Sequence, residues 1–162
     1  MKIFRKIMFA VAAATFALPG VPVAAQAATS PIVLTGDVKA VKITTAPDGT
    51  ERTELTEPSA IIPGDRLIFG TQYHHSGTEP VSNFTVTNPL PAAVRLAPDA
   101  DPALAVSIDG GKTWGVLAAL TVASSDGTAR PATHADVTHV RWVLSRIAPG
   151  AEGRLTYPAI IR

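Results

Sequence analysis

The stretch Val137-Thr138-His139-Val140-Arg141-Trp142-Val143-Leu144-Ser145 decides the fold, because apolar side chains recur in it at every second position. Successive side chains of a strand point to opposite faces of its sheet. The alternation therefore predicts a strand whose core face carries Val140, Trp142 and Leu144. His139, Arg141 and Val143 fall on the opposite face.

Shorter runs with the same period occur along the rest of the chain, separated by turns rich in glycine and proline. Strands are expected at 32–45 (with a break near Thr35-Gly36), 52–56, 67–74, 81–87, 103–109, 113–122, 137–145 and 155–161. The segment from Ser124 to Ala135 is polar and is predicted to be a loop. After residue 27 no helical periodicity lasts three turns, so the pattern is that of an all-β antiparallel sandwich or barrel.

The N-terminal 27 residues have the three parts of a secretory signal peptide. Residues 1–6 include three basic side chains, residues 7–18 form an uncharged apolar run, and Ala25-Gln26-Ala27 has the small-x-small form that signal peptidase cleaves. That run of 12 residues is shorter than the roughly 20 needed to span a bilayer, so a retained anchor is the weaker alternative. We predict a signal peptide at 1–27, a single domain at 28–162, and export to the periplasm, the cell surface or the medium.

Loss of the signal peptide would change the charge of the chain. It would remove three of the 14 basic residues and none of the 13 acidic ones, leaving a net charge of −2. No basic cluster remains, so nucleic acid and anionic membranes are not expected partners. The chain has no cysteine, and therefore neither disulfides nor the acylated cysteine of a lipoprotein. We expect no membrane anchor after cleavage, and a protein or a polysaccharide of the envelope or extracellular space as the partner.

Motifs in both halves of the chain resemble one known family. The motifs are Pro63-Gly64-Asp65, Tyr73-His74-His75-Ser76-Gly77-Thr78-Glu79-Pro80, Val86-Thr87-Asn88-Pro89-Leu90-Pro91, Ser107-Ile108-Asp109-Gly110-Gly111-Lys112-Thr113-Trp114, Val140-Arg141-Trp142 and Ala148-Pro149-Gly150. In this order, over residues 55–162, they resemble the conserved-repeat domain of bacterial surface proteins, domain of unknown function eleven. The resemblance implies an immunoglobulin-like antiparallel β-sandwich of about 7–9 strands with no established enzymatic activity. The chain departs from that pattern at His75, where Asn is usual, at Asn88, where Asp is usual, and in having a single copy.

Histidines are the first candidates for a metal site. His74 and His75 are adjacent, and adjacent strand residues point to opposite faces, so the pair cannot share one ion. We predict that His74 is a solvated residue at a strand end and that His75 is a turn residue. His134, Asp136 and His139 form a better trio, but their spacing matches no metal signature. No metal ligand is assigned, and metal binding by the trio stays open.

Motifs for catalysis are missing from the sequence. There is no Gly-x-Ser-x-Gly nucleophile elbow and no cysteine, and the acidic residues are scattered as on an ordinary surface. The sequence Asp109-Gly110-Gly111-Lys112 lacks the dense acids of a calcium loop and predicts a hairpin turn. Trp114 and Trp142 are candidates for stacking on sugars, although the apolar neighbours of Trp142 favour a core position. We assign no catalytic and no cofactor-binding residue and predict that the protein is not an enzyme.

These expectations lead to an exported contact module. The segments Ser124 to Ala135 and Asp48 to Pro58 are the predicted contact regions, because a sandwich binds through its loops or its open strand edges. One alternative is self-assembly by donor-strand exchange, in which Ala28 to Leu34 would enter a neighbour's sheet. The other is a small-ligand or metal-binding module that uses the trio His134, Asp136 and His139.

Overall fold

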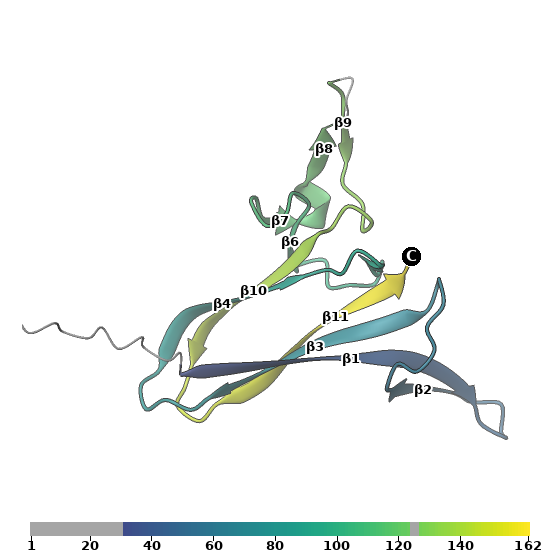
Figure 1. The fold of residues 1–162 in the computed structure, drawn as a ribbon, viewed down its shortest axis with the longest axis horizontal. Coiled ribbons are helices and arrows are strands. Elements are labelled where there is room, and N and C mark those ends of the chain that lie inside the picture. The colour runs from purple at the N-terminus through teal and green to yellow at the C-terminus, as the bar shows by residue number, and fades with distance from the viewer. Residues whose placement is uncertain (1–30, 124–126) are drawn as a thin grey trace, which may run out of the picture.

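The computed structural model describes residues 31–123 and 127–162, whose regular secondary structure is almost entirely strands (Figure 1). The strands are β1 (Ile32–Thr45), β2 (Glu51–Thr56), β3 (Arg66–His75), β4 (Val81–Pro89), β5 (Val94–Leu96), β6 (Ala105–Ser107), β7 (Gly115–Val116), β8 (Thr121–Ala123), β9 (Ala129–Pro131), β10 (His139–Ile147) and β11 (Glu152–Ile161). A 3-10 turn, Leu117–Ala119, lies between β7 and β8. The predicted signal peptide lies outside the described residues.

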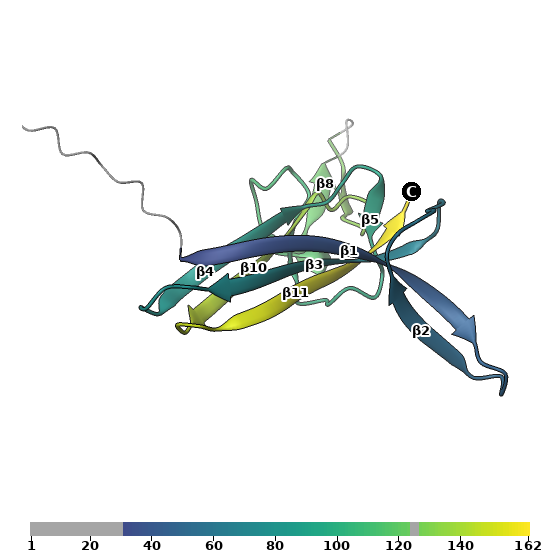
Figure 2. The same cartoon turned by 60° about the horizontal axis from the view of Figure 1, so that its bottom comes forward.

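Two antiparallel sheets face each other, and a small hairpin extends from one end (Figures 1 and 2). The first sheet has the order β2-β1-β3-β11-β5, the second has the order β4-β10-β6-β7, and β8 pairs with β9 alone. The predicted all-β antiparallel sandwich is therefore confirmed, in an arrangement consistent with an immunoglobulin-like fold. The described residues form eleven strands rather than 7–9, because several short segments of two or three residues also pair.

The core lies between the two sheets and follows the predicted alternation. Val140 in β10 and Ala159 in β11 are fully buried, while Leu67 in β3 and Tyr157 in β11 are almost so. The Tyr157 ring stacks on Phe69 with centroids 5.1 Å apart, and Trp142 of the second sheet lies 6.2 Å from it. The core position predicted for Trp142 is thus confirmed by its packing against this cluster.

The predicted break near Thr35-Gly36 is wrong. The two residues pair with Gln72 and Thr71 of β3, and β1 runs without interruption from Ile32 to Thr45. Glycine lowers strand propensity, but here a continuous ladder to a central strand outweighs that local preference.

The predicted strand at 113–122 is also wrong. Only β7 and the start of β8 are strands, and the 3-10 turn between them brings Leu117 and Leu120 against the core. Side chains three residues apart share one side of such a turn, so burial of both leucines selects it over a strand. Within the predicted loop from Ser124 to Ala135, the described part contains β9, whose Arg130 pairs with Val122.

Candidate functional site

His75 is a buried structural residue and not the turn residue that the sequence predicts. It is the last residue of β3 and has no exposed surface. Its Nδ1 lies 2.8 Å from the carbonyl oxygen of Ala148, and its backbone N–H donates to Ala151 at 2.9 Å. His75 thereby holds the turn between β10 and β11, while its Nε2 is buried without a hydrogen-bond partner. Pairing with β1 and the backbone hydrogen bond to Ala151, next to β11, extend β3 through His75. The adjacent Ser76-Gly77 turn signal had indicated that β3 ends before His75.

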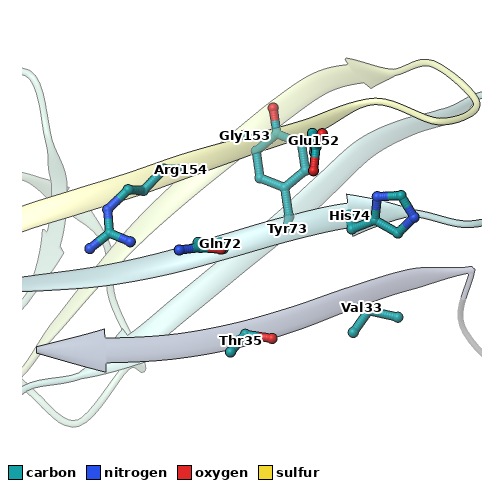
Figure 3. A pocket seen from close by; sticks show the side chains of 8 residues that line it. All are labelled: Val33, Thr35, Gln72, Tyr73, His74, Glu152, Gly153 and Arg154. Atoms are coloured by element: carbon teal, nitrogen blue, oxygen red, sulfur yellow. The ribbon is translucent and has the colours of Figure 1, made fainter.

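His74 is exposed, as predicted, and faces the outer side of the first sheet. There it lines a shallow hollow of about 310 Å³ over β1, β3 and β11 (Figure 3). In the register of these strands His74 lies between Val33 and Glu152, and Gln72 lies between Thr35 and Arg154. The hollow is open to solvent and its lining is mixed in polarity.

An ion pair crosses the middle strand of this outer face. Asp37 of β1 accepts a hydrogen bond of 2.7 Å from the guanidinium of Arg154 in β11, and Gly70 of β3 lies beneath the pair. A Cβ on Gly70 would lie 2.5 Å from Asp37 Oδ1, so glycine is needed for the two charges to meet. The hydrogen bond from Arg154 lowers the pKa of the Asp37 carboxyl below its ordinary value. The pair links β1 and β11 across β3, and the guanidinium of Arg154 is therefore already hydrogen-bonded within the sheet.

The trio His134, Asp136 and His139 does not come together as a ligand set. Asp136 accepts hydrogen bonds of 2.8 and 2.6 Å from the guanidinium of Arg130, and its Oδ2 also accepts the Thr133 hydroxyl at 2.7 Å. The hydrogen bond from Arg130 holds the pKa of the Asp136 carboxyl well below its usual range. The residues that the structure describes contain no group of three or more metal-ligating side chains able to hold an ion.

Asp109 organises the predicted hairpin turn through its own carboxylate. The carboxylate accepts hydrogen bonds from the Thr113 N–H at 2.9 Å, the Thr113 hydroxyl at 2.7 Å and the Ser107 hydroxyl at 2.7 Å. These bonds, led by the one from the Thr113 backbone, hold the pKa of Asp109 well below its usual range. Gly110 and Gly111 have φ angles of 80° and 86°, which explains their place in this turn. The Asp109 carboxylate is therefore already hydrogen-bonded to residues of its own loop.

Trp114, the remaining candidate for sugar stacking, already contacts three residues of the chain through its indole ring. Its Nε1 donates to the Gly111 carbonyl at 2.9 Å, and the guanidinium of Arg141 lies 4.2 Å from the ring centroid. The His139 ring stands edge-on to it at 6.3 Å. A half-buried indole with a cation over its ring has less free face to offer a sugar.

The first predicted contact region, Asp48 to Pro58, belongs to a hairpin that projects from the sandwich (Figure 2). We call it the arm: residues 40–56, comprising the end of β1, the turn and β2. Pairing of β1 with β3 stops at Ala40, and pairing with β2 extends from Ala40 to Thr45. The turn is closed by the Ala46 N–H, which donates to Thr50 at 2.8 Å, and by Gly49 at φ 83°. The arm is thus a well-formed two-stranded ribbon.

The apolar side chains of β1 change face at the arm. Where the arm begins they point into the core, as Val38 and Ala40 do. Beyond Ala40 the inward positions become polar, and the apolar residues stand on the outer side, where Ile43 is 66% and Leu55 is 56% exposed. Sequence reasoning missed this change, although the order Val38-Lys39-Ala40-Val41-Lys42-Ile43 contains it as two apolar residues in succession. An apolar face outside the core is typical of a contact surface.

The second predicted contact region and the proposed donor strand are placed only in part. β8 and β9 form a hairpin that stands off the end of the second sheet (Figure 1), and residues 124–126 lie outside the described part. Of the donor segment, Ile32 to Leu34 pair with His75 to Tyr73 of the same chain, and residues 28–30 are not described. In this structure the described part of that segment is a strand of its own sheet.

Comparison of the chain with known protein families, with curated proteins and with solved structures gave no match. The class of protein is therefore defined by the fold alone, an antiparallel β-sandwich with a projecting arm. No helix within residues 31–123 and 127–162 is long and apolar enough to cross a membrane.

Proposed function

We propose that this protein is an exported, non-enzymatic immunoglobulin-like module that makes contacts with macromolecules at or outside the bacterial envelope. The observation that carries the proposal is the arm, which places an apolar face and an open strand edge away from the sandwich. The signal-peptide pattern of residues 1–27 and the resemblance to surface-protein domains support the location. Of the candidate site residues, His75, Asp109 and Asp136 make hydrogen bonds within the fold, which supports a structural role for them.

The contact role can be tested by crosslinking in cells that export the protein. A photo-reactive amino acid at Leu55, on the arm, is expected to give a defined crosslinked product. The matched control is Val143, which is 58% exposed on β10 of the other sheet and should give much less. Equal labelling at both positions, or none at either in an exported protein, would contradict the proposal.

The export step is tested on the same material. The N-terminus of the chain recovered outside the cytoplasm is expected to be Ala28, as mass spectrometry of the intact protein would reveal. A chain that keeps residues 1–27 and stays in the cytoplasm would contradict the proposed export and location. The contact role of the arm would still be decided by the crosslinking result.

A further inference from the structure

The arm has an edge that pairs with no other strand among the described residues. β2 is the last strand of its sheet and pairs only with β1. The Ala46 N–H bonds to Thr50, and antiparallel pairs alternate between hydrogen-bonded and non-hydrogen-bonded types. Every second pair counted from Ala46 and Thr50 is therefore hydrogen-bonded, namely Thr44 with Arg52 and Lys42 with Glu54.

The outward backbone groups of β2 follow from this alternation. They are the N–H and C=O groups of the remaining residues, Glu51, Thr53 and Leu55. A strand added to this edge must pair its own outward groups with these three residues. For a second copy of β2 in antiparallel orientation, the pairings allowed are those that oppose odd-numbered residues to odd-numbered residues.

Charge selects one of these registers. When Thr53 lies opposite Thr53 of the second copy, Arg52 lies opposite Glu54 on both sides of the two-fold axis. A shift to the next allowed register in one direction opposes Arg52 to itself, and a shift in the other direction opposes Glu54 to itself. No ion pair within the described chain occupies either side chain, so both charges are available to a partner. The sequence of β2 is thus complementary to itself in the register that its hydrogen bonds allow.

The apolar residues of the arm fit the same arrangement. The two-fold axis of such a pair is perpendicular to the sheet, so equivalent faces of both copies lie on the same side. Leu55 would lie opposite Glu51 of the second copy and diagonal to its Thr53, which shields part of a side chain now 56% exposed. Two isolated ribbons would become a sheet that runs continuously from one sandwich to the other.

We propose that the chain associates with a second copy of itself by antiparallel pairing of β2 with β2, centred on Thr53. The inference rests on the proposed contact role of the arm and names the partner. Three opposed residue pairs of this kind exchange roughly six backbone hydrogen bonds. The interface is smaller than the roughly 1,200 Å² of a standard protein complex, so the dimer is reversible and depends on concentration.

A charge exchange tests the register. Sedimentation velocity of the protein recovered from exporting cells, over a concentration series, is expected to show a monomer–dimer equilibrium. Arg52→Glu and Glu54→Arg each oppose like charges on both sides of the axis, and each should weaken dimerisation at least about tenfold. The double variant R52E/E54R restores opposite charges and should recover the dimer. Arg146→Glu, an equal charge change at an exposed position of β10, is the control and should leave the equilibrium unchanged.

A proline tests the edge independently of charge. Thr53→Pro removes an N–H that points away from β1, so the ladder within the arm keeps its bonds. We expect a monomer with an unchanged thermal transition. Failure of R52E/E54R to recover association, or a monomeric parent chain at about millimolar concentration, would overturn the inference. A parent chain that stays monomeric yet crosslinks from Leu55 to another macromolecule would refute self-pairing and leave the contact function standing.

Discussion

The alkaline stability of the fold depends on Tyr157, and replacing it by phenylalanine should change that dependence measurably. Tyr157 is 2% exposed in β11 and stacks on Phe69 in the centre of the core. Burial raises the pKa of its phenol to about 12, because the tyrosinate would have to be held away from water. Tyr157→Phe keeps the ring and its stacking partner but removes the group that titrates.

The magnitude follows from the difference between the two states. An unfolded tyrosine has a pKa of about 10, and the gap to about 12 corresponds to roughly 3 kcal/mol of free energy of unfolding. Below pH 10 the phenol is protonated in both states and the stabilisation is complete. Between pH 10 and 12 the unfolded chain releases the proton while the folded chain keeps it. The free energy of unfolding therefore falls as the pH rises through this window.

The measurement is urea unfolding at several pH values from 8 to 12, followed by circular dichroism. The parent chain should lose roughly 2 kcal/mol more than Tyr157→Phe by pH 12, where the folded phenol is half ionised, since the other alkaline groups titrate in both. Tyr73→Phe is the control and should lose stability as the parent does. Parallel loss in the parent and Tyr157→Phe, or tyrosinate absorbance showing that the remaining phenol of folded Tyr73→Phe titrates near pH 10, would refute the reasoning.

Three further substitutions test the roles of single side chains. His75→Ala should lower the free energy of unfolding in urea by about 2–3 kcal/mol, because it empties a buried site and removes a hydrogen bond, whereas His74→Ala on the exposed side should change it by less than about 0.5 kcal/mol. Gly70→Ala should cost about 1–3 kcal/mol by the same measurement, since a Cβ would separate the ion pair above it. Gly36→Ala should not, because its Cβ would lie 3.9 Å from the Gly70 carbonyl oxygen, an ordinary contact. Asp109→Asn should lower the melting temperature at pH 7. It should also reduce the loss of stability below about pH 4, because the pKa of Asp109 is lower in the folded parent than in the unfolded chain, and its contribution to the free energy of unfolding is lost as acid protonates the carboxylate. A melting curve of Asp109→Asn that shifts with acid as the parent curve does would contradict that role.

The sandwich could be predicted from sequence wherever a strand has water on one face and the core on the other. β10 shows this best, since Val140 is buried and Val143 is 58% exposed, as the alternation predicts. The turns at Gly49, Gly64, Gly110 and Gly150 were predictable for a similar reason, because their positive φ angles favour glycine. In both cases residues that lie close together in the sequence determine the local structure.

The predictions failed where distant contacts decide. His75 is a turn residue by its neighbours in sequence, and it is buried only because β1, β11 and the turn at Ala148 close around it. The 3-10 turn at Leu117 forms because two leucines reach the core together, a requirement that a local alternation does not express. The question that the sequence left open for the trio His134, Asp136 and His139 is answered by a local contact, because the Arg130 guanidinium, six residues before Asp136, donates hydrogen bonds to its carboxylate.

The other edges of the two sheets carry features that discourage pairing, and β2 differs from them. β4 ends at Pro89 and has Asn83 at φ 55°, while β5 and β7 contain only three and two residues. Proline, irregular backbone and short length are means by which edge strands avoid aggregation. β2 has six residues and none of these features, and its charges alternate in sign. Charges of one sign would repel an identical strand, whereas Arg52 and Glu54 attract it in one register. The edge of β2 therefore selects a partner rather than excluding all partners, which is what a surface used for specific contact requires.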